Sequence, residues 1–229
     1  LQEGFFLDYK DYLGIHKNIV FANPNAPTGM AISREEVEEI VKSNPDHIVI
    51  VDEAYVDFGG ESAVPLIDSY DNLLVCMTFS KSRSLAGARV GFIMGNADLI
   101  ADMNRLKYAT NPYNVNRMSQ AMALAAIKDP TYFRNNCLSI QYERKMTEDE
   151  LTKRGFLVLP SKANFLFAEH SKVSGEELYR KLKEKGILVR HFSRPEIADW
   201  IRITIGTQIE MKLLLKALDE IFEEMRKKK

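Results

Sequence analysis

Hydrophobic positions in the first half of the chain form four short runs, each bounded by polar or turn-forming residues. The runs cover 18–22, 47–51, 73–77 and 90–94. Their length and uniform apolar character predict buried strands rather than half-exposed ones. Such strands are typical of a mostly parallel sheet covered by helices on both faces, so we predict an α/β fold here.

Helical patterns lie between and after these runs. Ser33 and Glu36 have the spacing of a capping box, which predicts a helix that begins there and continues to about Lys42. Three more helices are predicted, at 96–108, 116–128 and 131–154, and Gly155 closes the last of them.

After the long helix the pattern changes to short strands around single helices. Strands are predicted at 156–160, 163–167, 186–190 and 200–206, with one helix capped by Ser174 and a final helix from about Gln208. This part is expected to be a small α+β unit. We therefore expect two domains: 1–130, part of a large domain, and 131–229, the long connecting helix with a small C-terminal domain.

Composition narrows the class of protein. The net charge is -1 and the chain is 45% hydrophobic and 28% charged, so nothing indicates a nucleic-acid or anionic-membrane partner. No apolar run is long enough to span a bilayer, and "LQEGFFLDYK" lacks the features of a secretory signal. Two cysteines rule out a disulfide framework, and their spacing does not support a zinc site. We expect a cytoplasmic protein.

Polar residues gather where the predicted strands of the first half end. "NPNAPTG" follows the first strand, Asp52 the second and Thr78 to Lys81 the third, while Arg89 comes just before the fourth. In open parallel sheets, ligands bind outside the carboxyl ends of the strands. These residues are therefore expected to converge on one site.

Each residue of this group also has an ordinary explanation, such as a solvated lysine or a turn aspartate. Lys81 stands between Ser80 and Ser82, and a lysine desolvated beside small residues has the lowered pKa that Schiff-base formation requires. A buried Asp52 would need a cationic partner such as a protonated ring nitrogen. Tyr55 could bind an aromatic oxygen.

The remaining polar residues of the group could bind phosphate. Thr78 and Ser80 supply hydroxyls and Arg89 a guanidinium, which together suit a phosphate group. Pyridoxal 5'-phosphate (PLP) carries all four complementary features: an aldehyde, a pyridinium, a phenolic oxygen and a phosphate. The joint order of these residues favours a PLP site over the separate ordinary explanations.

The order of the motifs resembles that of the fold-type I, PLP-dependent class I and II aminotransferases. The motifs extend over residues 23–207 and, more weakly, resemble the histidinol-phosphate aminotransferase branch. They read "NPNAPTG", "VDEAYVDF", "TFSKSRSLAGARVGF", "NPYNVN", "SKANFLF", "GILVRHF" and "WIRITIGT".

The resemblance implies a role for each cofactor-binding residue. Lys81 would bind PLP covalently and transfer protons, Asp52 would keep the ring nitrogen protonated, and Tyr55 would bind the phenolic oxygen. Thr78, Ser80 and Arg89 would hold the phosphate. Where many family members have an asparagine that donates to the phenolic oxygen, this chain has Ala26. Asn25 or a water would then compensate, or Asn23 and Asn25 only shape the turn.

The resemblance also implies a substrate pocket. Arg202 would bind the substrate carboxylate as a bidentate fork, and Arg190 would lie near the substrate's own phosphate. Asn164, Tyr113 and Asn114 would line the pocket. The implied reaction exchanges an amino group between histidinol phosphate and 2-oxoglutarate, in a homodimer that acts on small amino and keto acids and phosphorylated amines.

Alternatives stay open from the sequence. A related PLP enzyme, such as a threonine-phosphate decarboxylase or an aromatic aminotransferase, has similar motifs. Only 22 residues precede "NPNAPTG", whereas the family has a substantial region there that includes a phosphate-binding loop and an aromatic residue stacked on the ring. We therefore expect either a fragment or a naturally truncated protein, and a non-catalytic remnant of the fold is the second alternative.

Overall fold

The computed structural model describes residues 3–227, and the chain divides into two compact units. The first unit contains the segment up to Asn25 together with Ala31–Cys137. The second contains Ala26–Met30 and the chain from Leu138 onward. Each unit is described by itself below.

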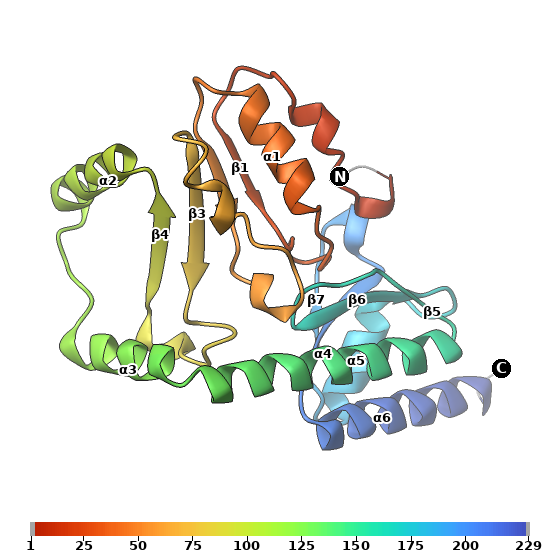
Figure 1. Ribbon diagram of the computed structural model, residues 1–229. Coiled ribbons are helices and arrows are strands. Elements are labelled where there is room, and N and C mark those ends of the chain that lie inside the picture. The colour runs from red at the N-terminus through yellow and green to blue at the C-terminus, as the bar shows by residue number, and fades with distance from the viewer. Residues whose placement is uncertain (1–2, 228–229) are drawn as a thin grey trace. The chain divides into compact units, whose positions relative to one another are not determined.

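The first unit is built on a four-stranded sheet in the order β1-β2-β3-β4 (Figure 1). β1, β2 and β3 are parallel, and β4 is antiparallel to β3. The prediction of a mostly parallel sheet is therefore confirmed. The strands are β1 (Ile19–Ala22), β2 (Val49–Asp52), β3 (Leu73–Thr78) and β4 (Gly91–Gly95).

α1 (Arg34–Ser43) packs on this sheet through its apolar face. Its Val37, Ile40 and Val41 are fully buried. The predicted capping box is present, because the Ser33 N–H donates to the Glu36 carboxylate at 2.7 Å and the Glu36 N–H donates to Ser33 Oγ at 3.2 Å. The N-terminus of α1 is therefore fixed by its own sequence.

Two helices follow β4. α2 (Ala97–Thr110) and α3 (Arg117–Lys128) begin at Asn96 and Asn116, whose side chains accept hydrogen bonds from backbone N–H groups of the first turn. Asparagine is among the preferred N-cap residues, which explains why both starts could be predicted within a residue or two.

The second unit has an antiparallel sheet in the order β5-β6-β8-β7. The long α4 (Pro130–Lys153) leads into it, and Gly155 follows with φ +86°. The other elements are β5 (Phe156–Val158), β6 (Phe165–His170), α5 (Gly175–Glu184), β7 (Arg190–His191), β8 (Trp200–Thr204) and α6 (Gln208–Lys227).

The core of this unit lies on one face of the sheet. Leu166 and Ala168 of β6 and Ile201 and Ile203 of β8 pack with buried residues of α5 and α6. Alternation along each strand directs the intervening residues to the opposite face, where Phe165, Phe167 and Arg202 lie. Arg202 is therefore on the face away from this core.

One predicted strand is mostly absent. Of the range 186–190, only Arg190 joins the sheet, with His191, as the short edge strand β7. Gly186 has φ +78° and Leu188 is 76% exposed, so the apolar run forms a connection rather than a buried strand. Within residues 3–227, no helix is both long and apolar enough to cross a membrane.

Candidate active site at the strand ends

The ends of β1, β2 and β3 lie at one edge of the first sheet (Figure 1). Ala22 pairs with Asp52, Asp52 pairs with Cys76, and Thr78 lies two residues beyond. Because β4 is antiparallel, its first residue Gly91 pairs with Thr78, so Arg89 also belongs to this edge. The segments therefore end at the same edge of the sheet, and the assembly of their side chains into one site stays a prediction.

The turn after β1 is held by Asn23. This residue is 2% exposed, and its side chain both donates to the Ile32 carbonyl and accepts from the Ile32 N–H, each at 3.0 Å. Its backbone N–H donates to the Asp52 carbonyl at 2.9 Å. Asn23 therefore shapes the turn, while the role of the half-buried Asn25 in binding the cofactor stays a prediction.

Gly29, the last residue of "NPNAPTG", belongs to the second unit and packs closely against Ser161. Its φ is +79°, and a Cβ there would lie 2.3 Å from Ser161 Oγ. The Gly29 carbonyl also accepts a hydrogen bond from the Lys162 N–H at 2.7 Å. Both the backbone conformation and the close approach therefore require glycine.

The two acidic residues after β2 have opposite environments. Strand alternation places Val51 and Glu53 on the buried side and exposes Asp52. Glu53 is 1% exposed and accepts from the Ser62 hydroxyl at 2.6 Å and the Ala63 N–H at 2.5 Å. Burial raises the pKa of Glu53, although these hydrogen bonds oppose the shift. The buried carboxyl at this strand end is therefore Glu53, whereas Asp52 is exposed, and the pairing of Asp52 with a ring nitrogen stays a prediction.

Asp52 is instead available for a ligand at the edge of the sheet. Its Oδ1 accepts from the Ala54 N–H at 3.0 Å, which fixes the carboxylate without burying it. Lys81 is also exposed, so the expected desolvation of its amine by its small neighbours is not found. Lys81 Nζ lies 5.3 Å from the centroid of the Tyr55 ring, so the amine and the phenol are neighbours.

The proposed phosphate-binding residues differ in how they are held. The Thr78 hydroxyl donates to the Val90 carbonyl at 3.3 Å and accepts from the Ser80 N–H at 3.0 Å. Arg89 is exposed, with φ 55°, and donates to the Ala86 carbonyl at 3.3 Å. A left-handed backbone costs a non-glycine residue about 1–2 kcal/mol, and such strain is concentrated at functional sites.

Two predicted substrate residues lie on the connection between α2 and α3. Tyr113 is 86% exposed, and Asn114 Oδ1 accepts a hydrogen bond from Lys107 Nζ at 2.8 Å. Their place in a substrate pocket stays a prediction. The other three, Asn164, Arg190 and Arg202, belong to the second unit.

Arg190 and Arg202 are direct neighbours across β7 and β8. The guanidinium carbon of Arg202 lies 5.0 Å from the Phe165 ring centroid, and that of Arg190 lies 5.5 Å from the Phe192 ring centroid. Arg202 Nε is buried and has no hydrogen-bond acceptor among residues 3–227. Like charges directly opposite each other on a sheet are destabilising, so this pair suits an anion that offsets the repulsion.

Asn164 immediately precedes β6. Its side chain is half-buried, and its carbonyl accepts a hydrogen bond from the Ile205 N–H at 2.9 Å. That backbone bond fixes the residue beyond the end of the β6–β8 pairing, close in sequence to the Phe165 ring under Arg202. A role in substrate binding stays a prediction.

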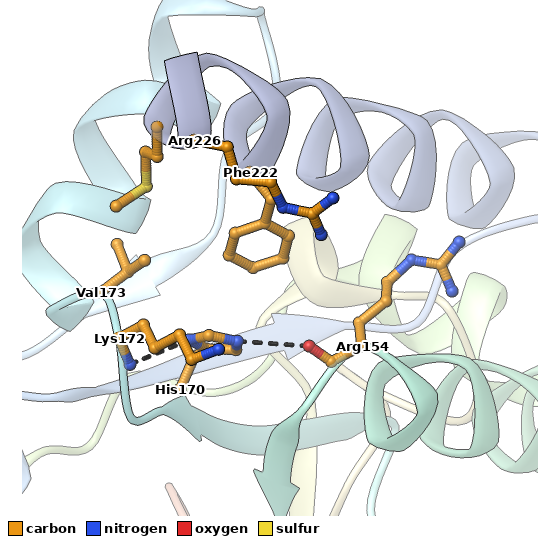
Figure 2. A pocket seen from close by; sticks show the side chains of 7 residues that line it. Arg154, His170, Lys172, Val173, Phe222 and Arg226 are labelled. Atoms are coloured by element: carbon orange, nitrogen blue, oxygen red, sulfur yellow. Dashed lines mark hydrogen bonds between the residues drawn. The ribbon is translucent and has the colours of Figure 1, made fainter. Parts of the chain in front are cut away.

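A separate cavity of about 270 Å³ lies in the second unit, and sequence reasoning did not identify it. Figure 2 shows His170 with Phe222 above its ring and with Lys172 and Arg154 beside it. The Lys172 N–H donates to His170 Nδ1 at 3.1 Å, and Nε2 lies 3.2 Å from the Arg154 carbonyl. Since a carbonyl only accepts, His170 is neutral with its proton on Nε2.

The cations of this cavity are partly balanced by carboxylates. The Arg154 guanidinium binds Glu150 at 2.6 Å and Asp219 at 2.8 Å, and the hydrogen bond to Asp219 is the largest cause that raises its pKa. The cavity has an apolar wall of Val173, Phe222 and Met225. Its histidine is held in the neutral form by two backbone groups, and burial lowers the pKa of His170 further.

Sequence reasoning also missed a hydrogen bond beside Lys81. Ser82 is 5% exposed, and its hydroxyl donates to the Asp57 carboxylate. The next residue, Arg83, donates to the Ala126 carbonyl at 3.0 Å and lies over the Phe133 ring with its guanidinium carbon 3.5 Å from the centroid. The second aspartate of "DEAYVDF", Asp57, and the hydroxyl of Ser82 were the available signals, but nothing in the sequence shows that they pair.

The chain is similar in sequence and in structure to histidinol-phosphate aminotransferases. A histidinol-phosphate aminotransferase of Acinetobacter baumannii is 46% identical over 220 residues, which cover 96% of this chain and 61% of that protein. The chain therefore spans about three-fifths of this relative. The structure of the histidinol-phosphate aminotransferase from Clostridium acetobutylicum matches with a TM-score of 0.88 and 28% identity, over 98% of this chain and 70% of that chain.

A second solved structure includes the cofactor. The histidinol-phosphate aminotransferase from Sinorhizobium meliloti, in complex with pyridoxal-5'-phosphate, matches with a TM-score of 0.80 and 27% identity. The match covers 90% of this chain and 58% of that chain. The family model for aminotransferase class I and II matches residues 2–218. With a match over nearly its whole length, this chain belongs to the aminotransferase class I and II family.

Proposed function

We propose that this chain serves PLP-dependent transamination between histidinol phosphate and 2-oxoglutarate. The observation that carries the proposal is the gathering of Lys81, Asp52, Tyr55 and Arg89 at one edge of the sheet. The names of the similar proteins support the same reaction.

The residues at this edge fit PLP in chemical type. Lys81 offers an exposed amine beside the Tyr55 ring, and Asp52 offers a carboxylate that the Ala54 N–H fixes. Arg89 supplies an exposed guanidinium on a strained backbone. When bound, PLP supplies an electron-accepting ring that stabilises the charge left on the substrate carbon after proton removal.

The protein side chains would divide the remaining work. Lys81 would hold the cofactor covalently until the substrate amine displaces it, and the released Nζ would then accept the proton from the substrate carbon that carries the amine. Asp52 would accept a hydrogen bond from the protonated ring nitrogen, because an opposite charge within a few ångströms favours the protonated form. Tyr55 would donate to the phenolic oxygen, and Arg89, with Ser80 and Thr78, would hold the phosphate.

Arg190 and Arg202 would let one site accept two different substrates. Histidinol phosphate carries a phosphate and no carboxylate, whereas 2-oxoglutarate carries two carboxylates. The phosphate and the carboxylates are anionic groups, and the two adjacent guanidinium groups supply charge of the opposite sign. Arg202 would bind the carboxylate next to the reacting carbon, and Arg190 would bind the substrate phosphate.

Substitution of the two arginines tests this division. Arg190→Ala should lower kcat/KM for histidinol phosphate by at least about tenfold more than for its unphosphorylated analogue, because a charged hydrogen bond contributes about 1.5–3 kcal/mol. Arg202→Lys keeps the charge and removes the bidentate fork, so activity with 2-oxoglutarate should fall. Equal losses for the phosphorylated and unphosphorylated amines would contradict the role of Arg190.

The transamination itself is tested by formation of glutamate from 2-oxoglutarate and histidinol phosphate in the PLP-loaded protein. Glutamate formation that depends on Lys81 supports the proposal. Release of carbon dioxide from threonine phosphate, or transfer only from aromatic amino acids, would indicate a related PLP enzyme instead.

We also propose a homodimer, supported by exposed apolar side chains on α3 such as Met118, Leu124 and Ile127. Light scattering measures its mass.

A further inference from the structure

The backbone around Lys81 is fixed on both sides, although its side chain is exposed. On the N-terminal side, Phe79 is 5% exposed and its N–H donates to the Val90 carbonyl at 3.0 Å. On the C-terminal side, the buried Ser82 hydroxyl donates to Asp57. The Ser84 N–H also donates to the Lys81 carbonyl at 3.0 Å, which closes a tight turn at the lysine.

Asp57 lies on the short 3-10 helix Val56–Phe58, which begins directly after Tyr55. Its charge reaches the same buried cluster as Arg83. Burial, and next the Asp57 carboxylate, raise the pKa of the Cys137 thiol to about 11, while Arg83 opposes this shift. Asp57 is half-buried and accepts a hydrogen bond from the buried Ser82 hydroxyl, so it is packed against the lysine turn rather than fully solvated.

We infer that the Ser82–Asp57 hydrogen bond positions Lys81 relative to Tyr55. The bond joins the residue after Lys81 to a residue two positions after Tyr55, so it connects the two segments behind their reactive groups. The 5.3 Å separation of Lys81 Nζ and the Tyr55 ring then depends on this connection as well as on the sheet. That this separation matters for catalysis rests on the proposed function. Ser82 and Asp57 are positioning residues and bind neither cofactor nor substrate.

The first unit contains a matched control bond. The Ser62 hydroxyl donates to the Glu53 carboxylate at 2.6 Å, so it is also a short bond between a hydroxyl and a carboxylate. It holds the 61–63 segment and does not involve the turn at Lys81. Ser82→Ala and Ser62→Ala therefore remove the same kind of group, and both should lower stability.

Hydrogen exchange tests the connection without any cofactor. When a hydrogen bond is lost, the equilibrium constant for local opening of the segment that it holds rises by up to about tenfold. In Ser82→Ala, the amides of Ser84 and Leu85, which donate to Lys81 and Phe79, should exchange about tenfold faster than in the wild-type protein. In Ser62→Ala they should exchange at the wild-type rate. Unchanged exchange in Ser82→Ala would overturn the inference.

Cofactor binding is the second readout. The dissociation constant of PLP should rise by about fivefold to tenfold in Ser82→Ala and Asp57→Ala, less in Asp57→Asn, which keeps an acceptor oxygen, and not in Ser62→Ala. Faster exchange with unchanged PLP affinity would overturn the positioning role. Absence of covalent PLP at Lys81 in the wild-type protein would instead contradict the proposed function, and the exchange data would still decide whether Ser82 holds the turn.

Discussion

At the strand-end edge, the backbone at Arg89 adopts a conformation that its residue type disfavours. Its φ of 55° lies in the left-handed region, and the nearby Ser84 has φ 57°. Both belong to the connection from β3 to β4 that carries Lys81. Such strain persists only where the surroundings impose it, which agrees with a guanidinium held in place for a ligand.

Arg89→Gly should separate stability from binding. Glycine adopts the left-handed conformation without strain, so the free energy of unfolding should stay the same or rise by up to about 1 kcal/mol. PLP affinity should fall, because the guanidinium proposed to bind the cofactor phosphate is lost. Denaturant unfolding and PLP titration measure the two effects. Ser84→Gly is the control, with unchanged affinity expected, and a strongly destabilised Arg89→Gly protein would contradict this account.

His170 predicts a pH dependence that belongs to the second unit. Burial, and then the charge of Lys172, lower its pKa from 6.5, whereas the hydrogen bond with the Arg154 carbonyl raises it (Figure 2). Below that pH the unfolded chain takes up a proton that the folded chain does not. The free energy of unfolding should therefore decrease as pH falls below 6.5, and continue to do so until the folded histidine also protonates.

The variant His170→Gln tests this contribution. Its amide can still donate to the Arg154 carbonyl, but it does not titrate. Its free energy of unfolding should lose less than that of the wild-type protein between about pH 6.5 and pH 5. His191→Gln serves as the control and should retain the His170 contribution. Identical pH dependence of the wild-type and His170→Gln proteins would show that His170 is not held neutral by folding.

Helices that begin with a recognisable capping residue were predictable from the sequence. The capping box at Ser33 and the asparagine caps at 96 and 116 fix helix starts within a few residues of chain. The prediction of a strand over 186–190 was wrong, because only Arg190 and His191 pair with β8. No local sequence pattern shows where an edge strand begins or ends. Pairings such as Ser82 with Asp57 depend on segments 25 residues apart, which the sequence does not connect.

Gly29 and Gly186 give a matched comparison of two turns in the second unit. Their φ values are +79° and +78°, but a Cβ on Gly29 would strike Ser161, whereas nothing lies within 4 Å of one on Gly186. Gly186→Ala should cost about 1–2 kcal/mol for the backbone alone. Gly29→Ala should lower the free energy of unfolding by clearly more. Equal costs in chemical denaturation would show that Ser161 moves aside freely.

At the scale of the whole molecule, the chain contains the proposed PLP-binding lysine but spans only 61% of a similar aminotransferase. Lys81, Asp52 and Arg89 are exposed, and exposed groups hold a ligand more weakly than desolvated ones. We therefore expect the 229-residue protein to lose PLP readily on dialysis, while chemical reduction traps the cofactor that is bound.

The most direct test of the central claim is the location of that trapped cofactor. The protein is incubated with PLP, reduced with borohydride and mapped by peptide mass spectrometry. We predict that the pyridoxyl label is concentrated on Lys81, at least about tenfold above the exposed Lys107, and that Lys81→Ala removes it without transfer to another lysine. A label spread evenly over surface lysines, or one concentrated on Lys107, would contradict the assignment of Lys81 as the cofactor-binding residue.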